Sequence, residues 1–291
     1  MFSKEILGVR VDFGMSMDDV LIYIENVLLK KEGTHYICTT NPEFIMEAQK
    51  DEEFKRIINQ SDLSVPDGIG VVYAKDYLEK IKSFKRNVFF PLKAFFAGLC
   101  IGVKEGQSKE RITGVDLTHQ LCNLASRKKY NVFFLGGRAK NALGKHVIQN
   151  DKDMATEVSH ILSSKYPGLN VIGATSKFSA MEKDDKATVE YIKKCMDEKN
   201  VSSIDFLFIC YGHPRQEKWI ARNTHLIPAH VSLGTGGTFD NIVGSIELPP
   251  TIYTSRNMGW LYRLIRQPWR IKRIFMAFPT FPLKVFRQSL K

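Results

Sequence analysis

A run of six apolar residues, followed by a turn and a polar cluster, most strongly constrains the fold of this 291-residue chain. The run extends from Phe206 to Tyr211 without polar alternation, which is typical of a strand buried on both faces. Gly212 and Pro214 end the run, and a helix is predicted to start near Arg215. A doubly covered strand that leads into a helix indicates an open α/β sheet, in which ligands bind at the carboxyl ends of the strands.

Three polar side chains of different chemistry stand at the predicted start of this helix. Arg215, Gln216 and Glu217 supply a cation, an amide and a carboxylate where free backbone N–H groups are also found. Such a cluster suits a substrate that carries negative charge and many hydroxyl groups. An ordinary solvated first turn has the same composition, so the residues alone leave both interpretations open.

The rest of the chain alternates between strand-like and helix-like patterns. Strands are predicted at residues 36–39, 63–65, 132–135 and 171–173, and from 231 into a glycine-rich turn. Helices are predicted at residues 18–29, from 42 onward, at 116–129 and at 187–199. This alternation predicts an α/β fold, with a Rossmann-like, mostly parallel sheet and helices on both faces.

Two glycine turns and one aspartate follow predicted strands. Gly136-Gly137 and Gly236-Gly237 have the backbone freedom to cradle a phosphate, although a plain tight turn needs the same residues. Asp67 stands between a proline and a glycine, so its carboxylate is predicted at the edge of the sheet where ligands bind. Aspartate is also a common turn former, and that alternative stays open.

The positive charge of the chain is concentrated at one end. The net charge is +11, and residues 251–291 contain nine Lys or Arg and no Asp or Glu. A basic segment of this kind suits phosphates, nucleic acid or an anionic membrane surface. Nucleic-acid binding would favour basic residues interleaved with exposed aromatic residues over a groove. Here the charge lies after the polar motifs in the sequence, so we expect the basic segment to bind an anionic membrane surface and not nucleic acid. Nucleic-acid binding remains the alternative.

Cysteine usage and hydropathy indicate a cytoplasmic protein. The five cysteines are odd in number and form no Cys-x-x-Cys pair, which favours reduced thiols. The first residues lack a signal-peptide pattern, and no run of 18 or more apolar residues could span a bilayer. The seven histidines show no ligand spacing, and we interpret Asp151 and Asp153 as surface charge, so no metal site is predicted.

A series of short motifs in a fixed order is far more specific than any of these features alone. The motifs are Thr39-x-Asn41-Pro42-Glu43, Pro66-Asp67-Gly68-Ile69-Gly70, Arg111-x-Thr113-Gly114-x-Asp116-Leu117, Phe134-Leu135-Gly136-Gly137, Gly212-x-Pro214-Arg215-Gln216-Glu217-x-Trp219, Gly236-Gly237-Thr238-Phe239-Asp240 and, in the tail, Gly259-Trp260 to Arg273. Together they resemble the WecG/TagA/CpsF family, glycosyltransferase family 26. The resemblance covers residues 36–273.

The resemblance implies a reaction. Members of this family transfer a sugar from a UDP-sugar to a polyprenyl-diphosphate-linked sugar at the cytoplasmic membrane face, in the synthesis of teichoic acid, capsule or other surface polysaccharides. We therefore expect a peripheral, inverting hexosyltransferase without a cofactor. An N-acetylmannosamine-type donor is favoured, with UDP-glucose or a UDP-uronic acid as the alternative. The residues do not indicate whether the protein forms homo-oligomers.

The resemblance also implies roles for residues. The family's general base corresponds to Asp67, with Thr39 and Asn41 orienting the base or the acceptor. Substrate binding is expected from the two glycine turns, from the cluster at residues 215–217 and from three tail arginines, which would grip a diphosphate and balance the charge of departing UDP. These arginines are Arg263, Arg270 and Arg273.

Three departures from the family pattern concern the donor sugar more than the reaction. They are Leu248-Pro249-Pro250 after the Gly-Gly-Thr-Phe-Asp motif, Gly259 before the tail tryptophan, and the segment around Ser176-Lys177-Phe178. An apolar insertion is predicted at about residues 78–109, and its phenylalanine-rich centre at 88–103 suits either a membrane-dipping element or core packing. We predict a catalytic α/β domain at residues 1–250 and a basic, amphipathic, membrane-associating appendage at residues 251–291.

Overall fold

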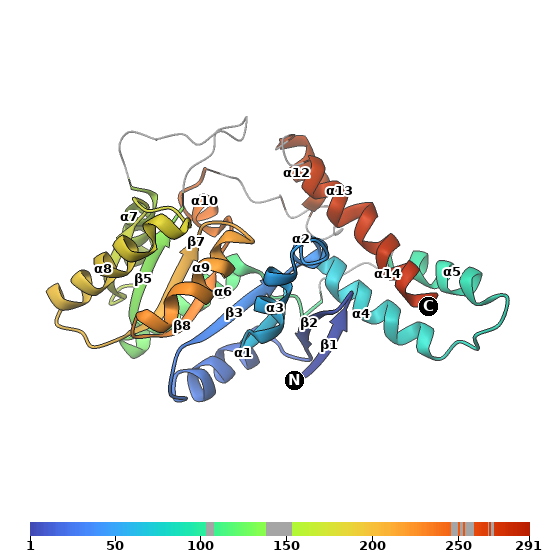
Figure 1. Cartoon of the computed structure of the whole chain (residues 1–291), viewed down its shortest axis with the longest axis horizontal. Helices are drawn as coiled ribbons and strands as arrows, with labels where there is room; N and C mark the ends of the chain where they lie inside the picture. Colours follow the sequence, from blue (N-terminus) through green and yellow to red (C-terminus); the bar gives the residue numbers. More distant parts are fainter. Residues whose placement is uncertain are drawn as a thin grey trace.

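The computed structural model describes residues 1–102, 108–137, 153–245, 250, 253, 259–266, 268 and 271–291. Its centre is a six-stranded, wholly parallel sheet in the order β4-β3-β8-β7-β5-β6 (Figure 1). The strands are β3 (His35–Thr40), β4 (Leu63–Pro66), β5 (Asn131–Gly136), β6 (Asn170–Thr175), β7 (Ile204–Cys210) and β8 (Ala229–Gly234). The predicted α/β fold with a parallel sheet is confirmed.

Helices cover both faces of this sheet. One face packs against α1 (Met17–Tyr23), its continuation η1 (Ile24–Leu28), α6 (Gly114–Lys128) and α7 (Met154–Lys165). The other face packs against α8 (Glu182–Glu198) and α9 (Arg215–Asn223). Alternate residues of β7 take part in the two cores, since Phe206 and Phe208 join the first and Leu207 and Ile209 the second. This alternation explains why the sequence of β7 is apolar without interruption.

A third cluster of buried side chains forms beside β3 and β4. It includes residues of α2 (Pro42–Glu47), α3 (Glu52–Gln60) and α4 (Ile69–Lys82), together with the antiparallel hairpin β1 (Phe2–Ile6) and β2 (Val9–Phe13). The hairpin is tied to β4 because the Ser64 amide donates to Asp12 Oδ2 at 2.8 Å and the Ser64 hydroxyl donates to the Arg10 carbonyl at 2.8 Å. This hairpin was not predicted.

The insertion and the end of the chain share this third cluster. The insertion contains α5 (Phe90–Gly102), and the tail forms α12 (Gly259–Arg266), α13 (Ile271–Phe275), η4 (Met276–Thr280) and α14 (Phe281–Ser289). Phe281 and Val285 of α14 are buried with residues of α2, α4 and α5. Figure 1 shows α14 lying beside α4 and α5, so the tail packs on the core of the molecule. The domain division at residue 250 stays a prediction.

No helix within the described ranges is both long enough and apolar enough to cross a membrane.

Candidate active site

Apart from Arg263 and Arg270, the predicted site residues follow strand ends at the carboxyl edge of the sheet or lie on helices that meet this edge. Here α10 (Thr238–Ile242) and α2 begin (Figure 1). The turn after β4 lies against the turn after β3, because the Asp67 amide donates to the Thr40 carbonyl at 2.9 Å. Gly68 has a φ of +111°, and a Cβ at that position would lie 3.4 Å from the Pro42 ring. Glycine is therefore suited to this turn, which holds Asp67 beside the start of α2.

Asn41 and Thr39 define the end of β3 in different ways. Asn41 caps α2, since its Oδ1 accepts a hydrogen bond from the Phe44 amide at 3.0 Å. Thr39 is buried, and its hydroxyl faces the first residue of α6: a Cβ on Gly114 would lie 3.6 Å from Thr39 Oγ1 and 3.7 Å from the Thr235 carbonyl. The ends of β3 and β8 thus meet the positive end of a 15-residue helix, which favours negative charge nearby.

Gln216 joins the turns that follow β7 and β8. Its Oε1 accepts hydrogen bonds from the Gly212 and Gly236 amides, both at 3.0 Å, while its Nε2 donates to Glu217 Oε1 at 2.7 Å. The side chain is 1% exposed, so it lies beneath the two turns and is not open to a ligand. Gln216 was predicted to bind substrate. The structure instead places it as a clamp that fixes the backbone of both turns.

Glu217 is the buried partner of this clamp. It is 1% exposed, and its Oε2 has no hydrogen-bond partner among the described residues. A Cβ on Gly234 would lie 2.7 Å from Glu217 Oε1, so only a glycine at the end of β8 leaves room for the carboxyl group. Burial raises the pKa of Glu217 to about 7, from an ordinary value of 4.5.

The raised pKa of Glu217 predicts a pH-dependent stability. The folded protein keeps this proton up to about pH 7, whereas the unfolded chain releases it near pH 4.5. The contribution of Glu217 to stability is therefore fully present below pH 4.5 and is lost as the pH rises through 7. The free energy of unfolding should fall by about 2–3 kcal/mol between pH 5 and 8 from this group. Glu217→Gln should remove that part of the dependence, as measured by denaturant unfolding at both pH values. Glu52→Gln, whose side chain is 80% exposed, is the matched control and should keep the wild-type slope.

The two glycine turns differ in the space around them. Gly136 and Gly137 have φ values of +86° and +88°, and a Cβ on either would lie 2.8 Å from an aromatic ring, of Tyr211 and Phe239 respectively. These glycines are thus required by packing. Gly236 has a φ of +58°, and a Cβ added there would have no described atom within 4 Å, while one on Gly237 would meet only Asp240 among the described residues, at 3.8 Å. Among the described residues, the second turn is therefore less crowded than the first and leaves room for a ligand.

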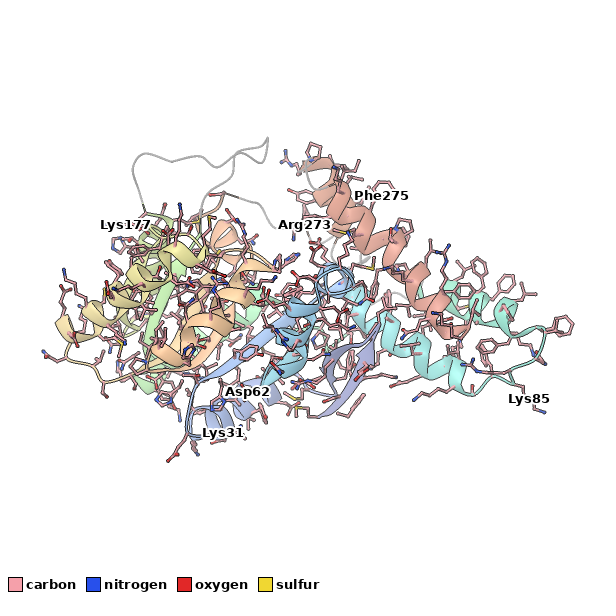
Figure 2. All side chains as sticks on the ribbon, viewed as in Figure 1. Lys31, Asp62, Lys85, Lys177, Arg273 and Phe275 are labelled. Carbon is pink, nitrogen blue, oxygen red and sulfur yellow. The ribbon has the colours of Figure 1, made fainter. Side chains whose placement is uncertain are left out.

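One tail arginine reaches the site. Arg273 of α13 donates through Nε to Glu43 Oε2 at 2.6 Å, and a terminal guanidinium nitrogen binds the same oxygen. That guanidinium also lies 3.5 Å from His213 Nε2, in the turn after β7. Figure 2 labels Arg273 where the tail faces α2, next to the exposed Phe275.

The other predicted cations are placed less directly. Arg215 is exposed at the start of α9, and its guanidinium lies 3.8 Å from a Cβ position on Gly212. The side chain of Arg263 and the whole of Arg270 lie outside the described residues, so their predicted contacts are not described.

Sequence reasoning missed two participants, Glu43 and His213. Neither is among the residues for which the sequence predicts a site role, but Glu43 Oε2 lies 3.8 Å from His213 Nε2 and accepts a hydrogen bond from Arg273. The signal for Glu43 was its place in the Asn-Pro-Glu motif. Within the described parts of the chain, no three His, Cys, Asp or Glu residues are grouped as metal ligands would be.

The fold and this polar edge define an α/β protein with a candidate ligand site at the strand ends, and comparison with known proteins gives its family. The sequence model of the glycosyl transferase WecG/TagA/CpsF family matches residues 4–90 and 97–291. The chain belongs to this family and is a glycosyltransferase, as the motifs predicted.

Two relatives show the level of similarity. An N-acetylglucosaminyldiphosphoundecaprenol N-acetyl-beta-D-mannosaminyltransferase of Bacillus subtilis (strain 168) is 27% identical over 92% of this chain and 85% of its own length. A protein of the same name from Staphylococcus aureus (strain MW2) is 24% identical over 99% of this chain and 93% of its own length. Each match covers more than nine tenths of this chain.

Proposed function

We propose that this protein transfers an N-acetylmannosamine-type sugar from a UDP-sugar to a polyprenyl-diphosphate-linked sugar, with Asp67 as the general base. The observation that carries this proposal is the meeting of the Asp67 turn, the open Gly236-Gly237 turn and the Arg273 ion pair at one edge of the sheet, in a member of this family. The similarity to N-acetyl-mannosaminyltransferases supports the choice of donor and acceptor.

The proposed step is a single displacement. The acceptor hydroxyl gives its proton to the Asp67 carboxylate as its oxygen attacks the anomeric carbon. The bond between that carbon and the UDP oxygen breaks with inversion, and UDP leaves with the bonding electron pair. The positive end of α6 and the guanidinium of Arg273 stabilise the negative charge that develops on the diphosphate. Thr39 and Asn41 hold the turns that carry the base.

The donor sugar is tested with a panel of nucleotide sugars. We expect a water-soluble short-chain polyprenyl-diphosphate acceptor to accept N-acetylmannosamine from its UDP derivative faster than glucose or a uronic acid. Ser176 belongs to the segment that departs from the family, and its hydroxyl donates to the Gly136 carbonyl at 2.7 Å, so this segment adjoins the glycine turn after β5. Faster transfer of glucose or a uronic acid would replace the proposed donor but keep the reaction.

Transfer is expected to continue in excess EDTA. The reason is that guanidinium groups and a helix terminus supply positive charge where a divalent ion would otherwise balance the leaving diphosphate. The measurement is the transfer rate with and without the chelator. Loss of activity that Mg²⁺ or Mn²⁺ restores would contradict this prediction. It would direct attention to Asp151, outside the described residues, and to Asp153, which caps α7 by accepting from the Thr156 amide at 3.1 Å.

We also propose that the protein acts as a peripheral protein on the cytoplasmic face of the membrane, where a polyprenyl-linked acceptor is held.

A further inference from the structure

Helix α5 is apolar on both of its long faces. Its inner face is buried in the third cluster, beside β3 and β4, through Phe90, Ala94, Ala97 and Ile101. Its outer face leaves large apolar side chains in solvent, with exposed fractions of 56% for Leu92, 46% for Phe95, 55% for Phe96 and 51% for Leu99. A surface helix normally keeps only one apolar stripe, so the second face of α5 indicates a partner.

This outer face adjoins an exposed apolar surface of the tail. The rings of Phe95 and Phe286 are in edge contact, with centroids 6.1 Å apart, which places α5 directly against α14. In the described chain, 18 large apolar residues are exposed, and 12 of them lie in these two segments. The twelve are Val88, Phe89, Leu92, Phe95, Phe96, Leu99, Ile265, Ile271, Phe275, Phe278, Leu283 and Leu290.

The charges of the same two segments are of one sign. Residues 83–103 contain three Lys or Arg and no acid, and residues 251–291 contain nine and no acid. Two copies of such a surface would repel each other because both are positively charged, so a second copy of this chain does not suit the surface. A bilayer with anionic headgroups suits both the exposed apolar side chains and the positive charge, because the rings enter the acyl boundary while the cations contact the headgroups.

We propose that the outer face of α5 and the exposed apolar residues of the tail helices form one docking surface for an anionic lipid bilayer. The family's sequence model matches residues 4–90 and 97–291, so three of the four outer-face residues of α5 lie outside both matched stretches. The inference deepens the proposed function, on which it rests for the lipid-linked acceptor. It assigns membrane contact to α5, which lies within the predicted catalytic domain at residues 1–250, as well as to the tail.

Vesicle binding by a double variant tests this surface. Leu92→Glu with Phe96→Glu is expected to weaken co-sedimentation with phosphatidylglycerol–phosphatidylcholine vesicles by about ten-fold or more. Ile22→Glu with Met181→Glu is the matched control, because these residues are 57% and 61% exposed on α1 and before α8. The control should bind as the wild type does, and both variants should keep the wild-type melting temperature. Wild-type binding by the α5 variant would overturn the proposal.

A second measurement needs no substitution. Cys100 on α5 is the exposed cysteine of the chain, since the other four are buried. An environment-sensitive fluorophore on Cys100 is expected to shift to shorter wavelength with the anionic vesicles and much less with pure phosphatidylcholine. No shift with either vesicle would overturn the proposal. A shift that instead follows protein concentration without lipid, with a larger species by gel filtration, would assign the surface to self-association.

Failure of the proposed reaction gives a different result. Transfer to the soluble short-chain acceptor should be the same for the wild type, the α5 variant and the control, because none of these substitutions touches the site. If no UDP-sugar is transferred by the wild type, the reaction is wrong while the vesicle results still decide the docking surface.

Discussion

Asp67→Asn is expected to lower turnover by about 10²–10⁴, the usual contribution of a general base. The substitution keeps the shape of the side chain and removes its ability to take a proton. The backbone bond from the Asp67 amide to the Thr40 carbonyl does not depend on the side chain, so the turn and the fold should persist. The measurement is the transfer rate with saturating UDP-sugar and soluble acceptor, together with the melting temperature.

Asp62→Asn is the matched control for Asp67. Asp62 stands just before β4, at the opposite end of the same strand (Figure 2). There His35 Nδ1 lies 2.8 Å from Asp62 Oδ1. This variant should change the stability of the fold and leave turnover within a small factor. A folded Asp67→Asn protein with near wild-type turnover would show that Asp67 only forms the turn, and the base would have to be sought elsewhere.

The parallel sheet could be predicted from the sequence because its signals are local. The apolar run of β7 and the Asn-Pro start of α2 each lie within a few residues, and both were confirmed. The β1–β2 hairpin also carries a local signal that was overlooked: Val9, Val11 and Phe13 alternate and are fully buried, and Leu7 and Gly8 form the turn with positive φ values.

The site could be predicted only in part, since its pieces meet through long-range contacts. Motifs predict site roles for Asp67, Arg215 and the glycine turns, and these roles stay predictions, but the Arg273–Glu43 pair joins residues 230 positions apart. No periodicity or spacing shows which acid a tail arginine will meet. Composition also could not distinguish Gln216 as a buried clamp from an amide open to substrate, because burial depends on how α9 packs beneath β8.

Arg273→Glu is expected to lower turnover on the soluble acceptor by about 10²–10³, the effect of removing one group that stabilises transition-state charge. The side chains of the Arg273–Glu43 pair are 39% and 20% exposed, so the ion pair itself contributes only about 1 kcal/mol or less. The predicted loss corresponds to about 3–4 kcal/mol of transition-state stabilisation, which is more than the pair can supply. A loss of this size would therefore favour an action of Arg273 on the diphosphate, provided that breaking the ion pair alone does not reproduce it.

Two further variants separate the roles of Arg273. Lys272→Glu makes the same change of charge at the next, exposed residue and should leave transfer to the soluble acceptor unchanged. Glu43→Gln removes the ion pair and keeps the guanidinium, so it should retain most of the turnover if the diphosphate is the partner of Arg273. If Glu43→Gln is as inactive as Arg273→Glu, the arginine serves to hold α13 against α2. If Arg273→Glu runs normally on the soluble acceptor and fails only on vesicles, Arg273 is a membrane anchor and its diphosphate role is wrong.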